Sequence, residues 1–376
     1  MLEKQPGKRT FWAITLLYLL IGLEIVYMIS PFGLYYYSVY GEGLDFLNEH
    51  QLTAWLCAFF LPHIAHTSSW VLESFKSLGW VLAVLGFVGF LVAAVPIYVG
   101  KLRGGGAVIR GIYRYVRHPQ YTSLILCSFG LLLVWPRNIV MISFLAMTFA
   151  YYFLAKTEEK ECSAKFGPAF DAYVQRTGMF LPFDAWLRQR LWALPQRGIR
   201  RTVAVLGCFV GALVLGLALA HGARLWSVRS LYTAYADDAA MVSLVPLDRP
   251  VIHEAVGIAR TDPEVATRVR AATTDVSKFL IYVMPSEWSE SDIPMNTAGR
   301  HGHHEPPGWD RNRLKILIMQ AIVDRGTAPT GTELLLSVRD RKPIVEVTVA
   351  LNPEQVLTIE KPPETVRWGG IPTPIF

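Results

Sequence analysis

The stretch GIYRYVRHPQY, residues 111–121, gathers basic, aromatic and proline residues immediately before two apolar segments. These segments cover residues 120–135 and 138–155, and the Trp-Pro-Arg-Asn break between them is a helix stop followed by polar residues. At about 1.5 Å of rise per residue, each segment crosses most of a hydrocarbon core of roughly 30 Å. The pattern therefore predicts a helical hairpin in a membrane, with both open ends at the same face.

Two carboxylates, Glu158 and Glu159, follow the second arm of this hairpin. The hairpin brings them close to the basic residues that precede the first arm, among them Arg117 and His118. Guanidinium groups pair with carboxylates, whereas carboxylates hold an ammonium group, so such a cluster suits a zwitterionic ligand. Each element alone is more typical of a topology signal or a solvated helix end. Their occurrence at the two ends of one hairpin favours a binding site.

The spaced elements together resemble the isoprenylcysteine carboxyl methyltransferase and phospholipid methyltransferase superfamily over about residues 79–182. The matching elements are Gly-x-Tyr-x-x-Val-Arg-His-Pro-x-Tyr, the hairpin, Glu-Glu, the aromatic segment that begins at Phe166-Gly167, and a closing Leu-Pro. This resemblance implies that S-adenosylmethionine binds among the helix ends. It also implies that the methyl group passes to an oxygen, sulfur or nitrogen nucleophile of a lipophilic acceptor that arrives from the bilayer.

The resemblance assigns the cofactor site to five positions, which are His118, Pro119, Tyr121, Glu158 and Glu159. Tyr113 joins them as a ring that can stack on an adenine. The expected catalytic residues are Arg117, Glu158 and Glu159. Arg117 would hold a carboxylate of the cofactor or acceptor, and the glutamates would hold the cofactor ammonium group or polarise a bound group.

Two positions depart from the pattern of that superfamily. Ser123 stands where many members carry glycine, and Cys162 stands where many carry leucine. The serine narrows a close helix contact without removing a polar ligand. Both differences bear on the shape of the substrate rather than on the cofactor.

The composition is too apolar for one soluble domain, with 52% hydrophobic residues and a mean hydropathy of +0.32 over 376 residues. Spanning segments are predicted at 11–30, 79–99 and 202–221, in addition to the two hairpin arms. Residues 52–70 contain proline, histidine and serine residues that interrupt the apolar run, so we expect a re-entrant or interfacial segment there. The predicted fold is an all-α polytopic membrane bundle with a C-terminal soluble mixed α/β domain.

The predicted divisions of the chain follow these segments. They are N-terminal membrane segments 1–78, a methyltransferase-like core 79–182, an interfacial linker 183–201, an additional transmembrane helix 202–221, and an extracytoplasmic α/β domain 222–376. Lys and Arg outnumber Asp and Glu by 19 to 11 through residue 221, whereas the remaining residues hold 17 against 19. The basic balance therefore belongs to the membrane half, and a nucleic-acid partner is not expected.

Positive residues before the first span, in 101–117 and in 156–201 predict that these segments face the cytoplasm. The active site is then expected on the cytoplasmic face and the C-terminal domain on the opposite side. The alanine- and arginine-rich composition favours a bacterial inner membrane.

Three segments of the tail carry local signals of secondary structure. A helix start at 261–264 precedes 265–272, and Phe279–Met284 is rich in β-formers. Leu334–Val338 and Ile344–Leu351 flank a short polar link and predict a β-hairpin.

Two alternatives to a methyltransferase remain open on the sequence alone. One is an NADPH-dependent membrane reductase of related architecture, which would need more basic residues for the nucleotide phosphates. The other is a non-catalytic membrane anchor whose C-terminal domain binds a partner protein. The expected partners are a lipophilic substrate, membrane lipids and, in the second alternative, a protein that binds residues 222–376.

A histidine-rich stretch in the tail is a weak candidate for a metal site. His301, His303 and His304 offer imidazole nitrogens that suit transition metals. Prolines and a glycine follow immediately, and a solvated loop is the favoured interpretation.

Overall fold

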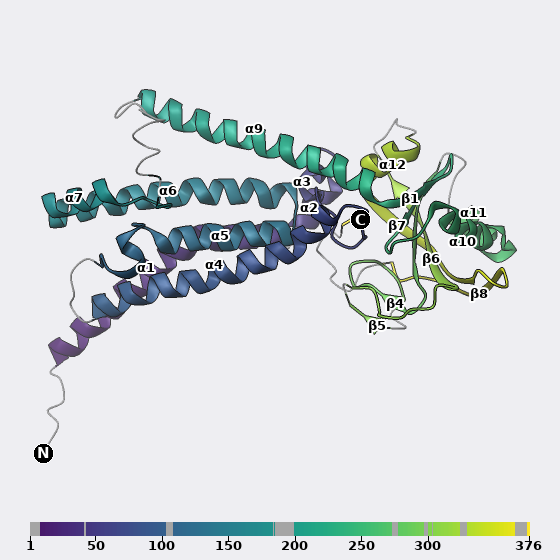
Figure 1. The fold of residues 1–376 in the computed structure, drawn as a ribbon, viewed down its shortest axis with the longest axis horizontal. Helices are drawn as coiled ribbons and strands as arrows, with labels where there is room; N and C mark the ends of the chain where they lie inside the picture. Colours follow the sequence, from purple (N-terminus) through teal and green to yellow (C-terminus); the bar gives the residue numbers. More distant parts are fainter. Residues whose placement is uncertain are drawn as a thin grey trace, which may run out of the picture. The chain divides into compact units, whose positions relative to one another are not determined.

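The computed structural model of the chain divides it into two compact units (Figure 1). The bundle unit comprises Met1–Val39, Gly79–Leu132 and Val140–Leu215, and the sheet unit comprises Tyr40–Leu78, Leu133–Ile139 and Gly216–Phe376. The structure describes residues 8–40, 43–102, 108–182, 184, 199–272, 277–296, 300–302, 304–323, 329–364 and 374–376.

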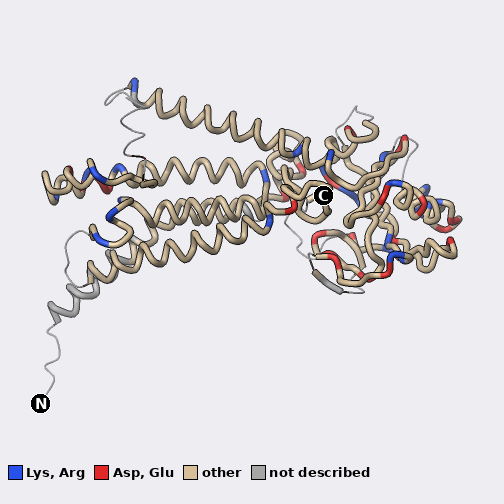
Figure 2. The backbone as a smooth tube through the Cα atoms, viewed as in Figure 1, with Lys and Arg blue, Asp and Glu red and all other residues tan. Residues whose placement is uncertain are grey.

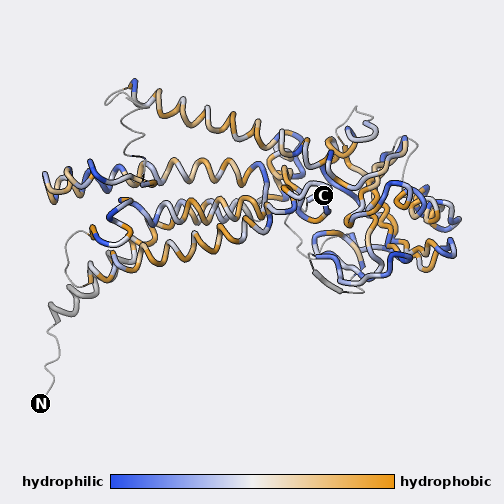
Figure 3. The backbone as a smooth tube through the Cα atoms, in the orientation of Figure 1, coloured by the Kyte–Doolittle hydropathy of each residue, from blue (hydrophilic) through white to orange (hydrophobic). Residues whose placement is uncertain are grey.

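Long helices supply most of the bundle unit. They are α1 (Lys8–Tyr40), α4 (Trp70–Leu102), α5 (Pro119–Val134), α6 (Asn138–Phe166), α7 (Pro168–Arg176) and α9 (Ile199–Ser230). Among the described residues, three stretches are long and apolar enough to cross a membrane, namely Trp70–Gly100, Asn138–Phe166 and Thr202–Ser230. Figure 3 shows hydrophobic residues along these helices, and Figure 2 shows few charges in their middle parts. The chain is therefore a multi-pass membrane protein.

The predicted hairpin is formed by α5 and α6, with the break at residues 135–137. The second arm is longer than predicted, because α6 continues to Phe166 and includes Glu158 and Glu159. Residues 155–165 contain neither glycine nor proline and consist largely of helix formers. The helix ends where Gly167 adopts a φ of 57°, a conformation that glycine takes at little cost.

Small residues allow α4 and α5 to approach closely. A Cβ atom added to Gly86 would lie 2.3 Å from the backbone nitrogen of Cys127, and one added to Gly130 would lie 2.3 Å from that of Ala83. A Cβ atom at Gly89 would lie 2.8 Å from Ser123 Oγ. Ser123 thus does face a close helix contact, as expected.

A six-stranded sheet organises the sheet unit. Its strands are β1 (Tyr232–Tyr235), β2 (Ala239–Ser243), β3 (Lys278–Pro285), β6 (Arg313–Ile322), β7 (Asp340–Ala350) and β8 (Gln355–Glu360), hydrogen-bonded in that order. The pair β2 and β3 is parallel, and the other neighbouring pairs are antiparallel. Helices α10 (Arg249–Thr261), α11 (Pro263–Ala272) and α12 (Gly331–Ser337) complete it, with a short pair β4 (Trp288–Ser289) and β5 (Arg300–His301). The predicted combination of a membrane bundle and a mixed α/β domain is confirmed.

Residues 52–70 contain no spanning helix. Helix α2 (Leu44–Glu49) and the four-residue α3 (Ala54–Cys57) are followed by irregular structure until α4 begins at Trp70. The backbone nitrogen of His66 donates to the carbonyl of Leu244 over 3.1 Å, and Ile64 shares a hydrophobic core with the strands. This segment is therefore an integral part of the sheet unit.

Two of the three local predictions for the tail are confirmed. Helix α11 begins where predicted, because Asp262 Oδ1 accepts hydrogen bonds from the backbone nitrogens of Glu264 and Val265 over 2.8 and 3.2 Å. Strand β3 includes the predicted Phe279–Met284.

The predicted hairpin of Leu334–Val338 with Ile344–Leu351 is wrong in its first strand. Leu334 lies in α12, and both Leu334 and the next residue, Leu335, are buried. In a strand with one exposed face, consecutive side chains would point alternately to the core and to the solvent, so only one of the two would be buried. Strand β7 instead forms a hairpin with β8 and also pairs with β6.

Candidate functional site

The site begins at a one-turn 3-10 helix, η1 (Gly111–Arg114), that joins α4 to α5. Gly111 has a φ of 64°, which lets the chain turn sharply into this element. The hydroxyl of Tyr113 donates to the carbonyl of Ala93 over 2.8 Å, and its backbone carbonyl accepts from the Tyr173 hydroxyl over 2.5 Å. Tyr113 thereby ties the start of the site to both α4 and α7.

Arg117 is a buried link between three elements. Its Nε donates to Glu159 Oε1 over 2.6 Å, and its Nη1 donates to the carbonyl of Val174 over 3.0 Å and to that of Thr177. Glu159 Oε2 also accepts from Lys156 Nζ over 3.0 Å. The side chains of Arg117 and Glu159 are only 2% and 10% exposed, so this pair acts within the protein rather than at its surface.

His118 lies between the two glutamates. Its Nδ1 is 3.3 Å from Glu158 Oε2, and its Nε2 is 3.7 Å from Glu159 Oε1. The ring stacks on Tyr121, with centroids 5.6 Å apart and planes inclined by 11°. Tyr121 in turn donates its hydroxyl proton to Glu158 Oε1 and stacks on Tyr151 at 4.8 Å. A buried aromatic column therefore fixes the positions of both His118 and Glu158.

Glu158 and Glu159 occupy different environments although they are adjacent in sequence. The side chain of Glu158 is 38% exposed, whereas Glu159 is held by Arg117 and Lys156. Because consecutive helical residues point about 100° apart, one carboxylate faces the cavity and the other faces the buried cation. Of these two carboxylates, Glu158 is the more accessible to a ligand.

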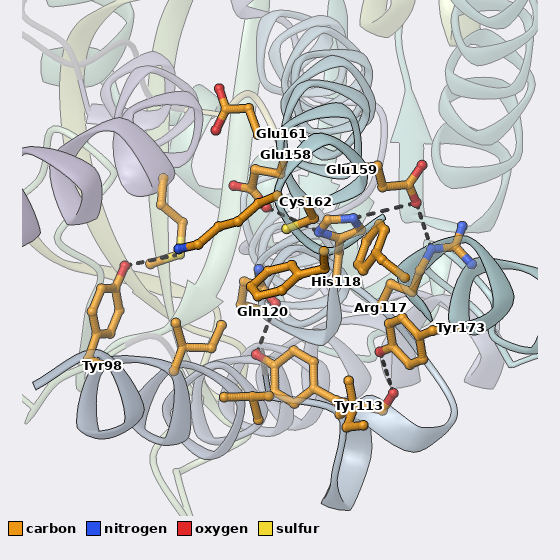
Figure 4. A pocket seen from close by; sticks show the side chains of 17 residues that line it. Tyr98, Tyr113, Arg117, His118, Gln120, Glu158, Glu159, Glu161, Cys162 and Tyr173 are labelled. Atoms are coloured by element: carbon orange, nitrogen blue, oxygen red, sulfur yellow. Dashed lines mark hydrogen bonds and ion pairs between the residues drawn. The ribbon is translucent and has the colours of Figure 1, made fainter. Parts of the chain in front are cut away.

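A cavity of about 360 Å³ opens beside these residues (Figure 4), a size within the range of small-molecule sites. Helix α6 contributes Glu158, Glu161, Cys162 and Lys165, which share one face at spacings of three, four and seven residues. The remaining lining residues are Met28, Ile97, Tyr98, Val108, Ile109, Tyr113, Arg117, His118, Gln120, Glu159, Phe166, Phe170 and Tyr173. The α6 face is thus mainly charged, and the rest of the lining combines aromatic and aliphatic side chains with the polar side chains of Arg117, His118, Gln120 and Glu159.

Burial and charge set the protonation of the groups outside the spanning helices. Desolvation lowers the pKa of His118, but Glu158 and Glu159 raise it more, so the pKa lies above 6.5. Burial raises the pKa of Tyr173 to about 12, although nearby Arg117 opposes the shift. Burial also raises the pKa of Tyr113. The tyrosines are therefore neutral donors at physiological pH, and the two glutamates stabilise the charged form of His118 relative to a free imidazole.

Five of the seven predicted site residues line the cavity, namely Tyr113, Arg117, His118, Glu158 and Glu159. Tyr121 is fully buried behind His118, and Pro119 begins α5 outside the lining. Tyr121 reaches the cavity only through its hydrogen bond to Glu158. The functional roles assigned to these residues stay predictions.

Sequence reasoning missed several wall residues, including Tyr98, Gln120 and Lys165. Helical spacing from Glu158 pointed to Lys165, but the helix was expected to end before it. Gln120 was visible within the motif, where it accepts from the Tyr113 hydroxyl over 3.2 Å through its Oε1. No local sequence pattern marks Tyr98, because its position in the cavity wall depends on how α4 packs in the bundle unit.

Comparison with protein families gives one decisive match. Residues 64–169 match the family model for phospholipid methyltransferase. This part of the chain is a methyltransferase domain of that family. The matched segment contains all of α4, η1, α5 and α6, so it includes the polar wall of the cavity. Curated proteins and solved structures give no match to the chain.

The methyltransferase domain overlaps the predicted 79–182 and begins earlier, at Ile64. Residues 64–169 accordingly form a membrane methyltransferase domain similar to the phospholipid methyltransferase family, a family whose enzymes use S-adenosylmethionine. The matched segment ends at residue 169, so the cavity lining also includes two residues of α7 beyond it, Phe170 and Tyr173.

Two predictions concern parts of the chain that the structure describes incompletely. Most of the interfacial linker 183–201 lies outside the described residues, as do His303 and the side chain of His301. Among the residues that the structure does describe, no group of three or more His, Cys, Asp or Glu side chains is arranged to hold a metal ion.

Proposed function

We propose that the protein transfers a methyl group from S-adenosylmethionine to an oxygen, sulfur or nitrogen nucleophile of a lipophilic acceptor. The observation that carries this proposal is the cavity wall on which Glu158 is presented by His118 and Tyr121. This wall lies at the end of apolar helices, where an acceptor dissolved in the bilayer can approach. The family match supports methyl transfer over the reductase and anchor alternatives.

The charges of the cavity suit the amino-acid part of the cofactor. Glu158 would hold the ammonium group, because it is the exposed carboxylate of the pair. Arg117 Nη2 is buried without a hydrogen-bond partner, which leaves one guanidinium donor for a carboxylate. Lys165 offers a second cation, since its described contact is with the ring of Phe166, at 5.4 Å. The two charges of a zwitterion thus have complementary groups.

The aromatic side of the cavity suits the adenosine part. Tyr98, Tyr113, Phe166 and Phe170 present rings that can stack on a purine, and Gln120 lies beside Tyr113. Met28 and Ile97 provide the apolar surface that an acceptor would follow.

Catalysis in this arrangement would rest on alignment and on charge placement. When bound, S-adenosylmethionine supplies an electrophilic methyl group on a sulfonium leaving group. The chain's own contribution is to hold the carboxylate of Glu158 in place, to keep Arg117 and Glu159 neutralised by each other, and to exclude water with the aromatic wall. Glu158 would hold the ammonium group or polarise the acceptor.

The proposal extends to location and partners. The basic segments support a site on the cytoplasmic face, with the sheet domain extracytoplasmic and the membrane that of a bacterium. The lipophilic substrate would come from the bilayer, and the C-terminal domain would be free to bind a partner protein.

Transfer of a labelled methyl group tests the function directly. The full-length protein in nanodiscs is incubated with S-adenosylmethionine labelled in its methyl group and a total membrane lipid extract, and label in the organic phase is measured. We expect the wild type and Glu254→Gln, a change at an exposed position of α10, to transfer label, and Glu158→Gln to lose most of the transfer. Absence of label, together with absence of S-adenosylhomocysteine binding, would overturn the proposal.

A further inference from the structure

A second cavity, of about 570 Å³, lies wholly within the sheet unit and shares no residue with the first. Its walls come from the segment that includes α2 and α3, from the turn of the helical hairpin, from α9, from the end of α12 and from the last three residues of the chain. Nothing in the proposed methyl transfer uses this cavity.

One face of the membrane helix α9 forms a wall of the cavity. Leu217, Ala220, His221 and Arg224 follow the spacing of a single helical face and all line it. The wall therefore changes along α9 from an aliphatic side chain to an imidazole and a guanidinium group. Other residues of the same helix, such as Leu215 and Leu219, are more than half exposed, as expected for a lipid-facing surface.

Arg224 has no acidic partner within the described part of the chain. Its described contacts are a hydrogen bond from Nη2 to the carbonyl of Leu336 over 3.3 Å and a position 6.0 Å from the ring centroid of Phe376. The described lining also includes Arg339 and three side-chain amides, from Asn48, Gln51 and Asn138, but neither aspartate nor glutamate. A half-buried guanidinium group beside a second arginine and neutral side-chain amides favours an anionic ligand.

Aromatic residues surround the same space. Trp55, Phe59, Phe60 and Phe376 line the cavity, and Trp55 is 46% exposed. Trp226, on the last turns of α9, is also exposed. Tryptophan at the end of a spanning helix is typical of the boundary between hydrocarbon and headgroups, where an anion and an apolar chain occur in one molecule.

We propose that this cavity binds a membrane lipid with an anionic phosphate headgroup, with the phosphate at Arg224 and His221 and an acyl chain beside Leu217. The site would hold such a lipid as a stable component of the sheet unit. Because its residues belong to the sheet unit alone, occupancy does not depend on the cofactor of the other unit.

Lipid retention by matched arginine variants tests this proposal. The full-length protein is purified in mild detergent, and lipids that remain bound are identified and quantified by mass spectrometry. We expect Arg224→Gln to retain about tenfold less anionic phospholipid than the wild type, the loss that one charge-assisted contact supports. Arg229→Gln is the control, because Arg229 is exposed on the same helix and lies outside the cavity lining. Equal retention by the two variants would overturn the proposal.

A second variant and a choice of probes distinguish the possible ligands. Ala220→Leu keeps every charge but fills the cavity, so it should also lose the lipid even if Arg224→Gln does not fold. Thermal stability of delipidated protein is then measured with phosphatidylglycerol, phosphatidylcholine or inorganic phosphate. We expect stabilisation by phosphatidylglycerol alone. Equal stabilisation by inorganic phosphate would point to a soluble anion, and equal stabilisation by phosphatidylcholine to non-specific solvation, and either result would contradict the proposal.

Discussion

Each unit contains a histidine next to a carboxylate, and the two pairs differ in their surroundings. In the bundle unit, His118 Nδ1 is 3.3 Å from Glu158, whose side chain is 38% exposed and lines a cavity. In the sheet unit, His63 Nε2 is 3.5 Å from Asp292, and both side chains are about 5% exposed or less. The distances are similar, so the pair itself does not identify a functional site.

The buried pair of His63 and Asp292 contacts several other residues of the sheet unit. The His63 ring lies 4.8 Å from that of Trp135 and 5.6 Å from that of Phe59, and its carbonyl accepts from Lys76 Nζ over 3.3 Å. The carbonyl of Asp292 accepts from Arg341 Nη2 over 2.9 Å. Neither His63 nor Asp292 lines either cavity described above. Access to a cavity, rather than the proximity of a histidine to a carboxylate, therefore distinguishes the candidate site.

Replacing the buried Arg117 of the bundle unit should have the largest effect, which is a loss of stability. We expect Arg117→Ala to lower the free energy of unfolding by about 3–5 kcal/mol, because Glu159 would keep a buried charge with fewer partners. Chemical denaturation in detergent measures the loss, and Arg176→Ala on exposed α7 is the control. An equal, small effect of both changes would show that the Arg117–Glu159 pair does not hold the site together.

Replacing the accessible carboxylate of Glu158 should weaken cofactor binding and leave the stability of the protein nearly unchanged. We expect Glu158→Gln to weaken S-adenosylhomocysteine binding by about 10- to 100-fold, the cost of losing a charged partner for the ammonium group. Its melting temperature should change little. Calorimetric titration and thermal unfolding of one preparation provide both numbers, and a large stability loss with unchanged affinity would reverse the roles of the two glutamates.

Replacing the buried carboxylate of Asp292 should change the stability of the protein and leave cofactor binding nearly unchanged. We expect Asp292→Asn to cost about 1–3 kcal/mol of stability, because it weakens a buried polar contact. Binding of S-adenosylhomocysteine should stay within twofold of the wild type. A selective loss of binding would mean that the sheet unit contributes to the cofactor site.

The smallest expected effect is a pH dependence that comes from His118. Its folded pKa lies above the unfolded value near 6.5, since Glu158 and Glu159 outweigh desolvation. Its stabilising contribution is therefore fully present below pH 6.5 and is lost as the pH rises through the folded pKa. Thermal unfolding across this window should show a decline in stability that His118→Gln removes and that His253→Gln, at an exposed position of α10, retains. An unchanged slope in His118→Gln would assign the titration to another group.

The sequence predicted the site as far as helical hairpin geometry determines it. Pro136 ends one arm, and the similar apolar lengths of the two arms return Glu158 to the level of His118, so their proximity follows from local rules. The separate roles of Glu158 and Glu159 were not predictable in the same way. They depend on the rotation of α6 against Arg117, which tertiary packing sets.

Long-range pairing explains what the sequence did not reveal. Residues 52–70 have an apolar composition, but Ile64 completes the core of a sheet whose strands begin more than 150 residues later. Likewise, Leu334 suits a strand or a helix by composition, and only the place of α12 against β2 decides between them. Contacts of this kind leave no periodic signal.

Calorimetric titration of S-adenosylhomocysteine into the full-length protein is the most direct test of Glu158 as a cofactor-binding carboxylate, with wild type, Glu158→Gln and Asp292→Asn compared in the same nanodiscs. We expect saturable binding by the wild type and by Asp292→Asn, and at least tenfold weaker binding by Glu158→Gln. Binding that is absent in the wild type, or equally strong in Glu158→Gln, would contradict this role of Glu158.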